Sequence, residues 1–218
     1  MSIPRDEIVT CPICGRRFET TLWETVNCEI DADLPQKLIS GEFFSRVCPG
    51  CRETIHIEHP LLYNDLNHDT FVQVAQSEED YRSALEQGDY ITSMIPNFRV
   101  VRSTAALSEK VTALENGLDD RVIELCRYMC LSSLMCSQTD FVYQDSFYQR
   151  VDGKDEFIFY DESGKSVVST PGPELYRVIC ERMHDALELS ASHEYEVDLY
   201  WAIGFMEQHM DLLDAPGE

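Results

Sequence analysis

Two short cysteine motifs constrain the fold of this chain more than any other feature of its sequence. Cys11-Pro12-Ile13-Cys14 and Cys48-Pro49-Gly50-Cys51 share the pattern Cys-Pro-x-Cys, and residues 15–47 separate them. Two cysteines at this spacing let one tight turn direct both sulfur atoms to a single point, and the proline fixes φ in that turn. We expect Gly15 and Gly50 to adopt a positive φ, so that backbone N–H groups approach the sulfurs. Four thiolates form the tetrahedral ligand set that Zn²⁺ prefers, so the sequence predicts a zinc site at Cys11, Cys14, Cys48 and Cys51.

Two other chemistries use cysteines with this spacing. A single Cys-x-x-Cys near a βαβ pattern is typical of a thioredoxin-like dithiol, but this chain has two such motifs and neither opens a predicted helix. A catalytic zinc ion needs an open coordination position, and four cysteines leave none. The sequence therefore favours a structural zinc site, which stabilises a fold without identifying an activity.

The balance of charge limits the partners that the chain can bind. Its 218 residues include 17 basic and 40 acidic ones, for a net charge of −23. Residues 1–60 contain 6 basic and 10 acidic residues, and the remainder contains 11 and 30. Such a field repels a phosphate backbone, and Arg16-Arg17 is the only adjacent basic pair, so nucleic acid is an unfavourable partner. We attribute the acidity first to solubility or a salt-adapted host, and second to a basic partner or DNA mimicry.

The sequence also predicts a soluble, cytoplasmic protein without a membrane partner. With 44% hydrophobic residues the chain can bury a core in one or two domains. Met1–Glu7 lacks the apolar segment of a signal peptide, and no run of about 18 apolar residues occurs. The nine cysteines are an odd number, four of them assigned to a metal, which indicates a reducing compartment rather than a disulfide framework.

Hydrophobic periodicity divides residues 18–125 into short strands and helices. Alternation predicts a strand or hairpin at 18–30, and a short helix at 31–41 has Asp33 as its N-cap. The remaining predicted elements are strands at 54–59, two within 61–75 and one at 98–102, and helices at 78–87, at 103–117 and from residue 119.

Several cysteines and histidines outside the two motifs could add metal ligands, and we expect that none does. His56 and His59 are three residues apart on a predicted strand and would point to opposite faces. Cys28 is expected to be a small buried residue. Cys126 and Cys130 lie four residues apart on the apolar stripe of a predicted helix, without a matching histidine or carboxylate, which favours a position in the core.

The C-terminal part, residues 138–218, is predicted to be a β-meander followed by two helices. Asp152-Gly153 is a hairpin dipeptide between two aromatic strands, and a second turn at Ser163-Gly164-Lys165 leads into a third strand. Apolar stripes then predict helices at 173–186 and at about 198–213.

These motifs resemble the CpXC domain family of bacterial proteins. The resemblance is carried by the paired Cys-Pro-x-Cys motifs and by Trp23, Val26-Asn27, Leu61–Asp65, Leu107–Lys110 and Gly117–Leu125. It covers roughly residues 8–135 and implies a zinc-ribbon-like domain, without an assigned activity. One position departs from the family pattern, because Arg52 stands where such motifs usually carry glycine.

No motif of a catalytic or nucleotide-binding site is present. The chain lacks the GxxxxGK loop, the GxGxxG fingerprint, the GxSxG elbow and HExxH. We therefore expect a non-enzymatic α+β protein with a zinc-ribbon-like domain and helical pair at 1–137, and an acidic β-meander packed with two helices at 138–218. The expected function is a zinc-stabilised interaction module for a protein partner. A transcription-linked nucleic-acid reader and a thiol redox switch are the alternatives.

Overall fold

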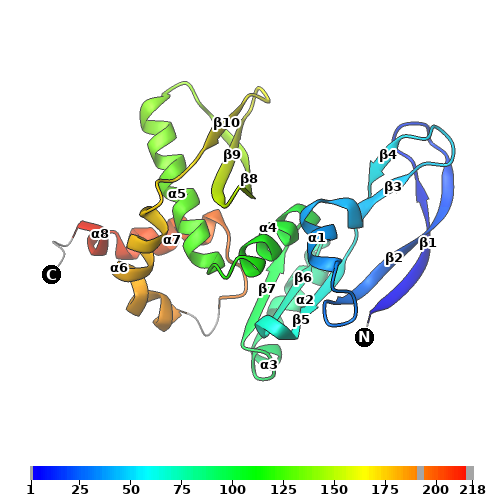
Figure 1. Ribbon diagram of the computed structural model, residues 1–218, viewed down its shortest axis with the longest axis horizontal. Helices are drawn as coiled ribbons and strands as arrows, with labels where there is room; N and C mark the ends of the chain where they lie inside the picture. Colours follow the sequence, from blue (N-terminus) through cyan, green and yellow to red (C-terminus); the bar gives the residue numbers. More distant parts are fainter. Residues whose placement is uncertain (1, 191–193, 215–218) are drawn as a thin grey trace. The chain divides into compact units, whose positions relative to one another are not determined.

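A computed structural model describes residues 2–190 and 194–214 and has the mixed α+β fold that the sequence predicts (Figure 1). Contacts within the chain divide it into two compact units, Met1–Val111 and Thr112–Glu218. Among the helices of the described ranges, none combines the length and apolar composition that crossing a membrane requires.

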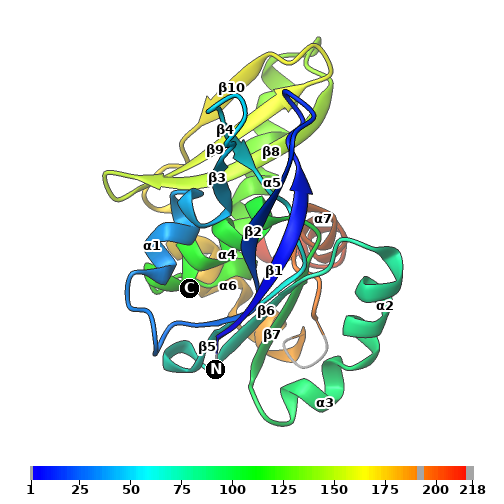
Figure 2. The ribbon, with the colours of Figure 1, turned by 90° about the vertical axis from the view of Figure 1, so that its right-hand side faces the viewer.

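A five-stranded mixed sheet forms the centre of the first unit (Figure 2). The β1–β2 and β5–β6 pairs are antiparallel, whereas the β2–β5 and β6–β7 pairs are parallel. One face is closely packed, because alternate residues of β5 and β6 are fully buried on it. In spatial order the strands are β1 (Ile3–Thr10), β2 (Arg17–Asn27), β5 (Leu61–Asp65), β6 (Thr70–Val74) and β7 (Asn97–Val101).

Short helices connect and flank these strands. Both α2 and α3 pack beside β7, as Figure 2 shows. Ser77 caps α2 by accepting a hydrogen bond from the N–H of Asp80, and Ser103 caps α4 by accepting one from the N–H of Ala106. The helices are α1 (Leu34–Ile39), η1 (Glu42–Phe44), η2 (Leu66–His68), α2 (Glu78–Glu86), α3 (Gly88–Thr92) and α4 (Thr104–Glu115).

Beyond the sheet, β1 and β2 continue as a two-stranded ribbon. Strand β2 pairs with β5 only over Thr25–Asn27, while its pairing with β1 continues to Arg17. A second hairpin, β3 (Ser45–Val47) and β4 (Thr54–His56), lies beside this ribbon (Figure 1). The guanidinium of Arg46 joins the two, because Nη2 donates to the carbonyl of Thr21 at 3.0 Å. Each hairpin carries one Cys-Pro-x-Cys motif in its turn.

Two strands of the first unit differ from the prediction. The predicted strand at 54–59 ends at His56. The N–H of Ile57 still donates to the carbonyl of Phe44 at 2.9 Å, but the N–H of Phe44 donates to the carbonyl of Gly41 and does not return the bond, so the pairing stops there. Strand β1 was not predicted, because Pro4 and the charged run Arg5-Asp6-Glu7 interrupt the apolar alternation. Both features are tolerated in β1 because it is an edge strand.

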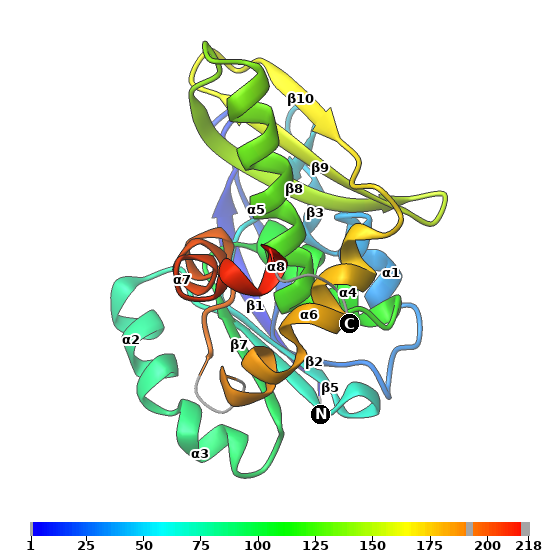
Figure 3. The ribbon, with the colours of Figure 1, turned by 90° about the vertical axis from the view of Figure 1, so that its left-hand side faces the viewer.

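The second unit consists of a three-stranded meander and helices (Figure 3). Helix α5 packs on one face of this sheet, where Tyr148, Phe157 and Phe159 are fully buried in the core. The predicted meander is confirmed, but the predicted helix at 198–213 is interrupted at Met210 and forms two helices. The elements are α5 (Asp120–Ser137), β8 (Tyr143–Val151), β9 (Lys154–Asp161), β10 (Ser166–Ser169), α6 (Leu175–Ser190), α7 (Leu199–His209) and α8 (Asp211–Asp214).

The compact units are not the same division as the domains that we predict at 1–137 and 138–218. Helix α5 belongs to the second unit, because its buried face packs with residues of the meander, α6 and α7. The predicted domains therefore remain a prediction, distinct from these contact-based units.

Candidate metal centre

The two cysteine motifs fold into matching turns. In the first, the N–H of Gly15 donates to the carbonyl of Cys11, and the N–H of Cys11 donates to the carbonyl of Arg16, both at 2.9 Å. In the second, the N–H of Arg52 donates to the carbonyl of Cys48, and the N–H of Cys48 donates to the carbonyl of Glu53, again both at 2.9 Å. Equal hydrogen bonding aims the two cysteines of each turn in equivalent directions. The repeated Cys-Pro-x-Cys spacing therefore produces a repeated structure.

The turns bring four sulfur atoms together with the spacing of a metal site. Sγ of Cys11 lies 3.8 Å from Sγ of Cys51, and Sγ of Cys14 lies 3.7 Å from Sγ of Cys48. All four sulfurs lie within 4.8 Å of one another. A tetrahedron with metal–sulfur bonds of about 2.3 Å has edges of about 3.8 Å, whereas a disulfide needs about 2.05 Å. The four thiols can therefore hold a metal ion, and the donor set fits zinc.

A very small apolar cluster supports these sulfurs. Cys11 and Cys48 are buried, and the only other buried member of the cluster among the described residues is Ile55. Phe18 and Ile57 pack against it and are themselves only partly buried. So little apolar surface contributes little to folding, and a bound metal would replace the missing core.

The thiols influence one another's protonation. The pKa of Cys48 is lowered to about 6, mainly because its sulfur accepts a hydrogen bond from the N–H of Cys51. Burial acts in the opposite direction, and a second hydrogen bond from the N–H of Gly50 lowers the pKa further. The N–H of Glu53 acts in the same direction on Cys51, but burial and the neighbouring thiols outweigh it and raise the pKa of Cys51 to about 12. These values belong to the group as a whole, because each thiolate opposes the next. A central cation relieves that repulsion.

The glycine prediction is half right. Gly15 has the expected positive φ, of 72°, but in the second turn the positive φ of 65° belongs to Arg52 and not to Gly50. Gly50 has another role, because a Cβ there would lie 2.7 Å from Cδ of Arg16 and 3.2 Å from Sγ of Cys14. The absence of a side chain at Gly50 allows the two turns to approach. Arg52 is exposed and carries the backbone strain that glycine avoids at the matching position of the first turn.

The other candidate ligands lie outside the four-thiol group. Cys28 is buried at the end of β2, and Cys126 and Cys130 belong to the core of the second unit, as predicted. Nδ1 of His59 lies 3.2 Å from the carbonyl of Ile57, and burial lowers the pKa of this imidazole. His56 contacts Glu58 and Thr104. The structure therefore brings together the four predicted cysteines and none of these five residues.

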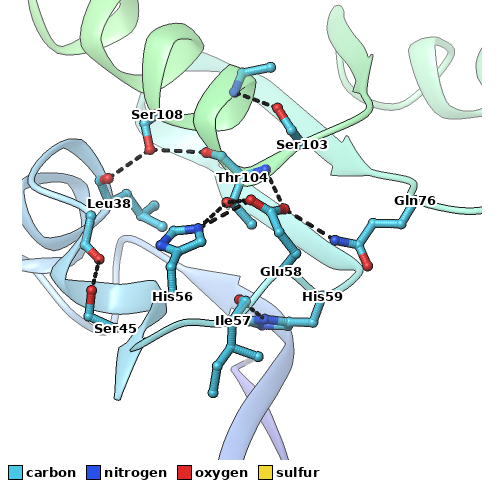
Figure 4. Close-up of polar contacts among 12 residues, drawn as sticks. Leu38, Ser45, His56, Ile57, Glu58, His59, Gln76, Ser103, Thr104 and Ser108 are labelled. Atoms are coloured by element: carbon cyan, nitrogen blue, oxygen red, sulfur yellow. Dashed lines mark hydrogen bonds and ion pairs between the residues drawn. The ribbon is translucent and has the colours of Figure 1, made fainter. Parts of the chain in front are cut away.

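A polar network that the sequence did not reveal connects the second hairpin to α4 (Figure 4). The carboxylate of Glu58 accepts from the N–H of Thr104 at 3.0 Å and from its hydroxyl at 2.5 Å. Gln76 donates to the same carboxylate, and Nε2 of His56 lies 3.2 Å from it. Burial opposes ionisation, but the bonds from Thr104 outweigh it and lower the pKa of Glu58. Glu58 thus stabilises the N-terminus of α4 from the segment that follows the second motif.

The fold and this site define a class of α+β proteins in which two hairpins bring together four cysteines that could hold a metal ion. The family described as CpXC protein matches residues 9–127, more than half of the chain, and the chain belongs to this family. The match contains both cysteine motifs and confirms the resemblance found in the sequence. No curated protein and no solved structure matches the chain.

Proposed function

We propose that this protein is a non-enzymatic, zinc-stabilised module that binds a protein partner. Cys11, Cys14, Cys48 and Cys51 hold one Zn²⁺ in a closed structural site. The observation that carries this proposal is the 3.7 and 3.8 Å separation of the sulfurs across the two turns, which fits the edges of a zinc tetrahedron. Zinc supplies folding free energy there, because the cluster around the sulfurs is too small to hold the hairpins together.

The chemistry beside the site supports a binding role rather than catalysis. A closed shell of four cysteines leaves no position for a substrate or an activated water. Thr104, His56 and Glu58 include the residue types of a nucleophilic triad, but both Thr104 and Glu58 contact Nε2 of His56. In a working triad the acid contacts the opposite ring nitrogen from the nucleophile. The arrangement is that of a helix cap.

Charge at the tips of the two hairpins supports a protein partner over nucleic acid. Arg16, Arg17, Arg46 and Arg52 lie close in sequence to the cysteines, but four thiolates outweigh the charge of one zinc ion and make the centre anionic. Glu19 and Glu53 offset the arginines further. Arg46 is also committed to backbone carbonyls of Phe43, Ser45 and Thr21. The remaining positive charge is too small for a phosphate-binding surface.

Exposed apolar residues on the two hairpins support the same partner class. Ile8, Ile13 and Val47 are 63%, 60% and 64% exposed, and they belong to β1, the first turn and β3. Rigid hairpins that display β-branched residues can bind a protein at little entropic cost. We place the protein in the cytoplasm, because none of the nine cysteines forms a disulfide within the described ranges.

Elemental analysis of protein purified without added metal or chelator tests the metal part of this proposal. We expect about one zinc per chain in the wild type. Cys11→Ser and Cys48→Ser should each lose it, while Cys136→Ser, which changes an exposed cysteine outside the site, should keep it. A metal-free protein with disulfides in the two motifs would overturn the proposal and favour a thiol switch.

Binding assays test the partner class. We expect no binding of mixed-sequence DNA or RNA at low salt, where electrostatic attraction is strongest. Binding that falls steeply with added salt and is lost in an Arg16→Ser, Arg17→Ser double variant would contradict the proposal and favour a nucleic-acid reader.

A further inference from the structure

The three-stranded sheet of the second unit has an apolar row on the face opposite its core. Tyr148, Phe157 and Phe159 point to the buried face, so their neighbours along the strands point outward. In the strand register, Phe147 lies opposite Ile158, and Ile158 lies opposite Val168. The three side chains therefore form one row across β8, β9 and β10.

This row is unusual for a face in contact with water. Val168 is 57% exposed, and Phe147 and Ile158 are half-buried. An antiparallel sheet with one solvated face normally alternates apolar residues on the inside with polar residues on the outside. Here each strand of the sheet carries one apolar outward residue of the row, and Tyr160 extends the patch along β9. Such a patch is typical of an interaction surface.

The negative charge of the second unit favours a basic partner for this row. The second unit, Thr112–Glu218, contains 22 acidic residues and 7 basic ones. On the outer face itself, Asp145 lies opposite Tyr160 in the register, and Glu156 lies beside the row and accepts a hydrogen bond from Gln149. A second copy of the chain would bring the same acidic surface against itself, which disfavours pairing of two such faces.

Beside the row, in the direction of Tyr160 along β9, lies a hollow with the chemistry of a cation site. Gln144, Asp145, Tyr160, Asp161 and Gly164 line this open hollow of about 500 Å³. Hydrogen bonds, first from the hydroxyl of Ser163, lower the pKa of Asp161, so its carboxylate is charged at neutral pH. A lysine or arginine over the Tyr160 ring would gain a cation–π contact together with these carboxylates.

We propose that the outer face of the β8–β9–β10 sheet binds a basic amphipathic helix of a partner protein. The row spans three strands, roughly 10 Å, which is about the width of one helix. Helices are the usual cover of a sheet face, as α5 is on the opposite side. The apolar stripe of the incoming helix packs on Phe147, Ile158 and Val168, and a lysine or arginine at its border enters the hollow at Tyr160. This surface belongs to the second unit, and the four cysteines belong to the first.

Fluorescence anisotropy of the full-length, zinc-loaded protein with a labelled model helix tests this proposal. The probe is a peptide of about 18 residues with leucine at core-facing helical positions and lysine elsewhere. We expect binding that weakens with salt. A peptide with glutamate in place of lysine should not bind, and a peptide of the same composition with scrambled leucine positions should bind at least about tenfold more weakly.

Variants locate the surface. Val168→Ser and Tyr160→Ser should each weaken binding about tenfold, while Leu189→Ser, which changes an 85% exposed residue of α6, should leave it unchanged. Equal binding by Val168→Ser and wild type, or equal binding of the scrambled peptide, would overturn the proposal. Analytical ultracentrifugation gives a further test: a dimeric wild type with a monomeric Val168→Ser variant would also overturn the proposal, because a second copy of the chain would then cover the row. Zinc content and the unfolding midpoint are measured for the same variants. If both are unchanged, weaker peptide binding comes from the altered surface and not from loss of the metal site.

Discussion

Replacing Arg52 by glycine is expected to stabilise the protein, although it removes a side chain. Arg52 has a φ of 65° in the second cysteine turn, where Gly15 occupies the matching position of the first turn with a φ of 72°. A non-glycine residue in this region costs about 1 to 2 kcal/mol, and glycine loses about 0.5 to 1 kcal/mol more backbone entropy on folding. Taking the middle of each range, the net gain for Arg52→Gly is about 0.75 kcal/mol, since the exposed Arg52 side chain contributes little packing.

The reverse substitution in the first turn provides the matched control. A Cβ at Gly15 would meet no atom within 4 Å, so Gly15→Ala tests backbone strain without a steric clash. We expect it to destabilise the protein by about 1 kcal/mol. The two substitutions should therefore act in opposite directions at equivalent positions.

Thermal unfolding of the zinc-loaded protein measures both effects. The chain has two tryptophans, and a Trp201→Phe background leaves Trp23 of β2 as the only tryptophan reporter of the first unit. The midpoint should rise by about 1 to 3 °C in Arg52→Gly and fall by a similar amount in Gly15→Ala. A lower midpoint in Arg52→Gly would refute the reasoning, since the arginine would then contribute more through its side chain than its backbone strain costs.

Three further substitutions probe other contacts. Gly50→Ala places a methyl group against Arg16, so zinc should transfer to a chelator faster than from the wild type. Glu58→Gln weakens the interaction with the N-terminus of α4 and should cost up to about 1 kcal/mol at neutral pH, measured by urea unfolding. Because the pKa of Glu58 is lowered by folding, its stabilisation is full above the unfolded pKa of about 4.3 and is lost as pH falls through the lower folded value. Glu124→Ala removes the ion pair that Glu124 makes with the buried Arg127 and should cost about 3 to 5 kcal/mol, whereas Glu124→Met with Arg127→Leu should cost much less.

Each of these predictions has a contradicting result. Equal zinc transfer rates in Gly50→Ala and wild type would mean that the turns can separate at no cost. Glu53→Gln, at an exposed position, is the control for Glu58→Gln, and equal unfolding curves of these two variants would remove the capping role. A double Glu124 and Arg127 variant as unstable as Glu124→Ala would mean that packing, not charge, dominates there.

Local signals made much of this structure predictable. The spacing of Cys11, Cys14, Cys48 and Cys51 was sufficient to identify the four thiols, because each turn is set by neighbouring residues. The meander was predictable for the same reason, since Asp152-Gly153 specifies a tight hairpin.

Features that depend on distant parts of the chain were not predictable. The parallel pairing of β2 with β5 joins segments separated by the whole second hairpin, and nothing local to either strand specifies it. Strand β1 forms because β2 provides a partner, although its charged run suggests a loop. The capping of α4 by Glu58 joins residues 46 positions apart. The positive φ of Arg52 is imposed by the turn against the preference of the residue.

X-ray absorption at the zinc edge of the purified, unmodified protein tests the central claim most directly. The proposed zinc site requires a single shell of four sulfur neighbours at about 2.3 Å, because the sulfurs already have the spacing of that tetrahedron. A shell with nitrogen or oxygen neighbours at about 2.0 to 2.1 Å would mean that a cysteine is replaced by a histidine or by water, and would contradict the closed site on which the proposed function rests.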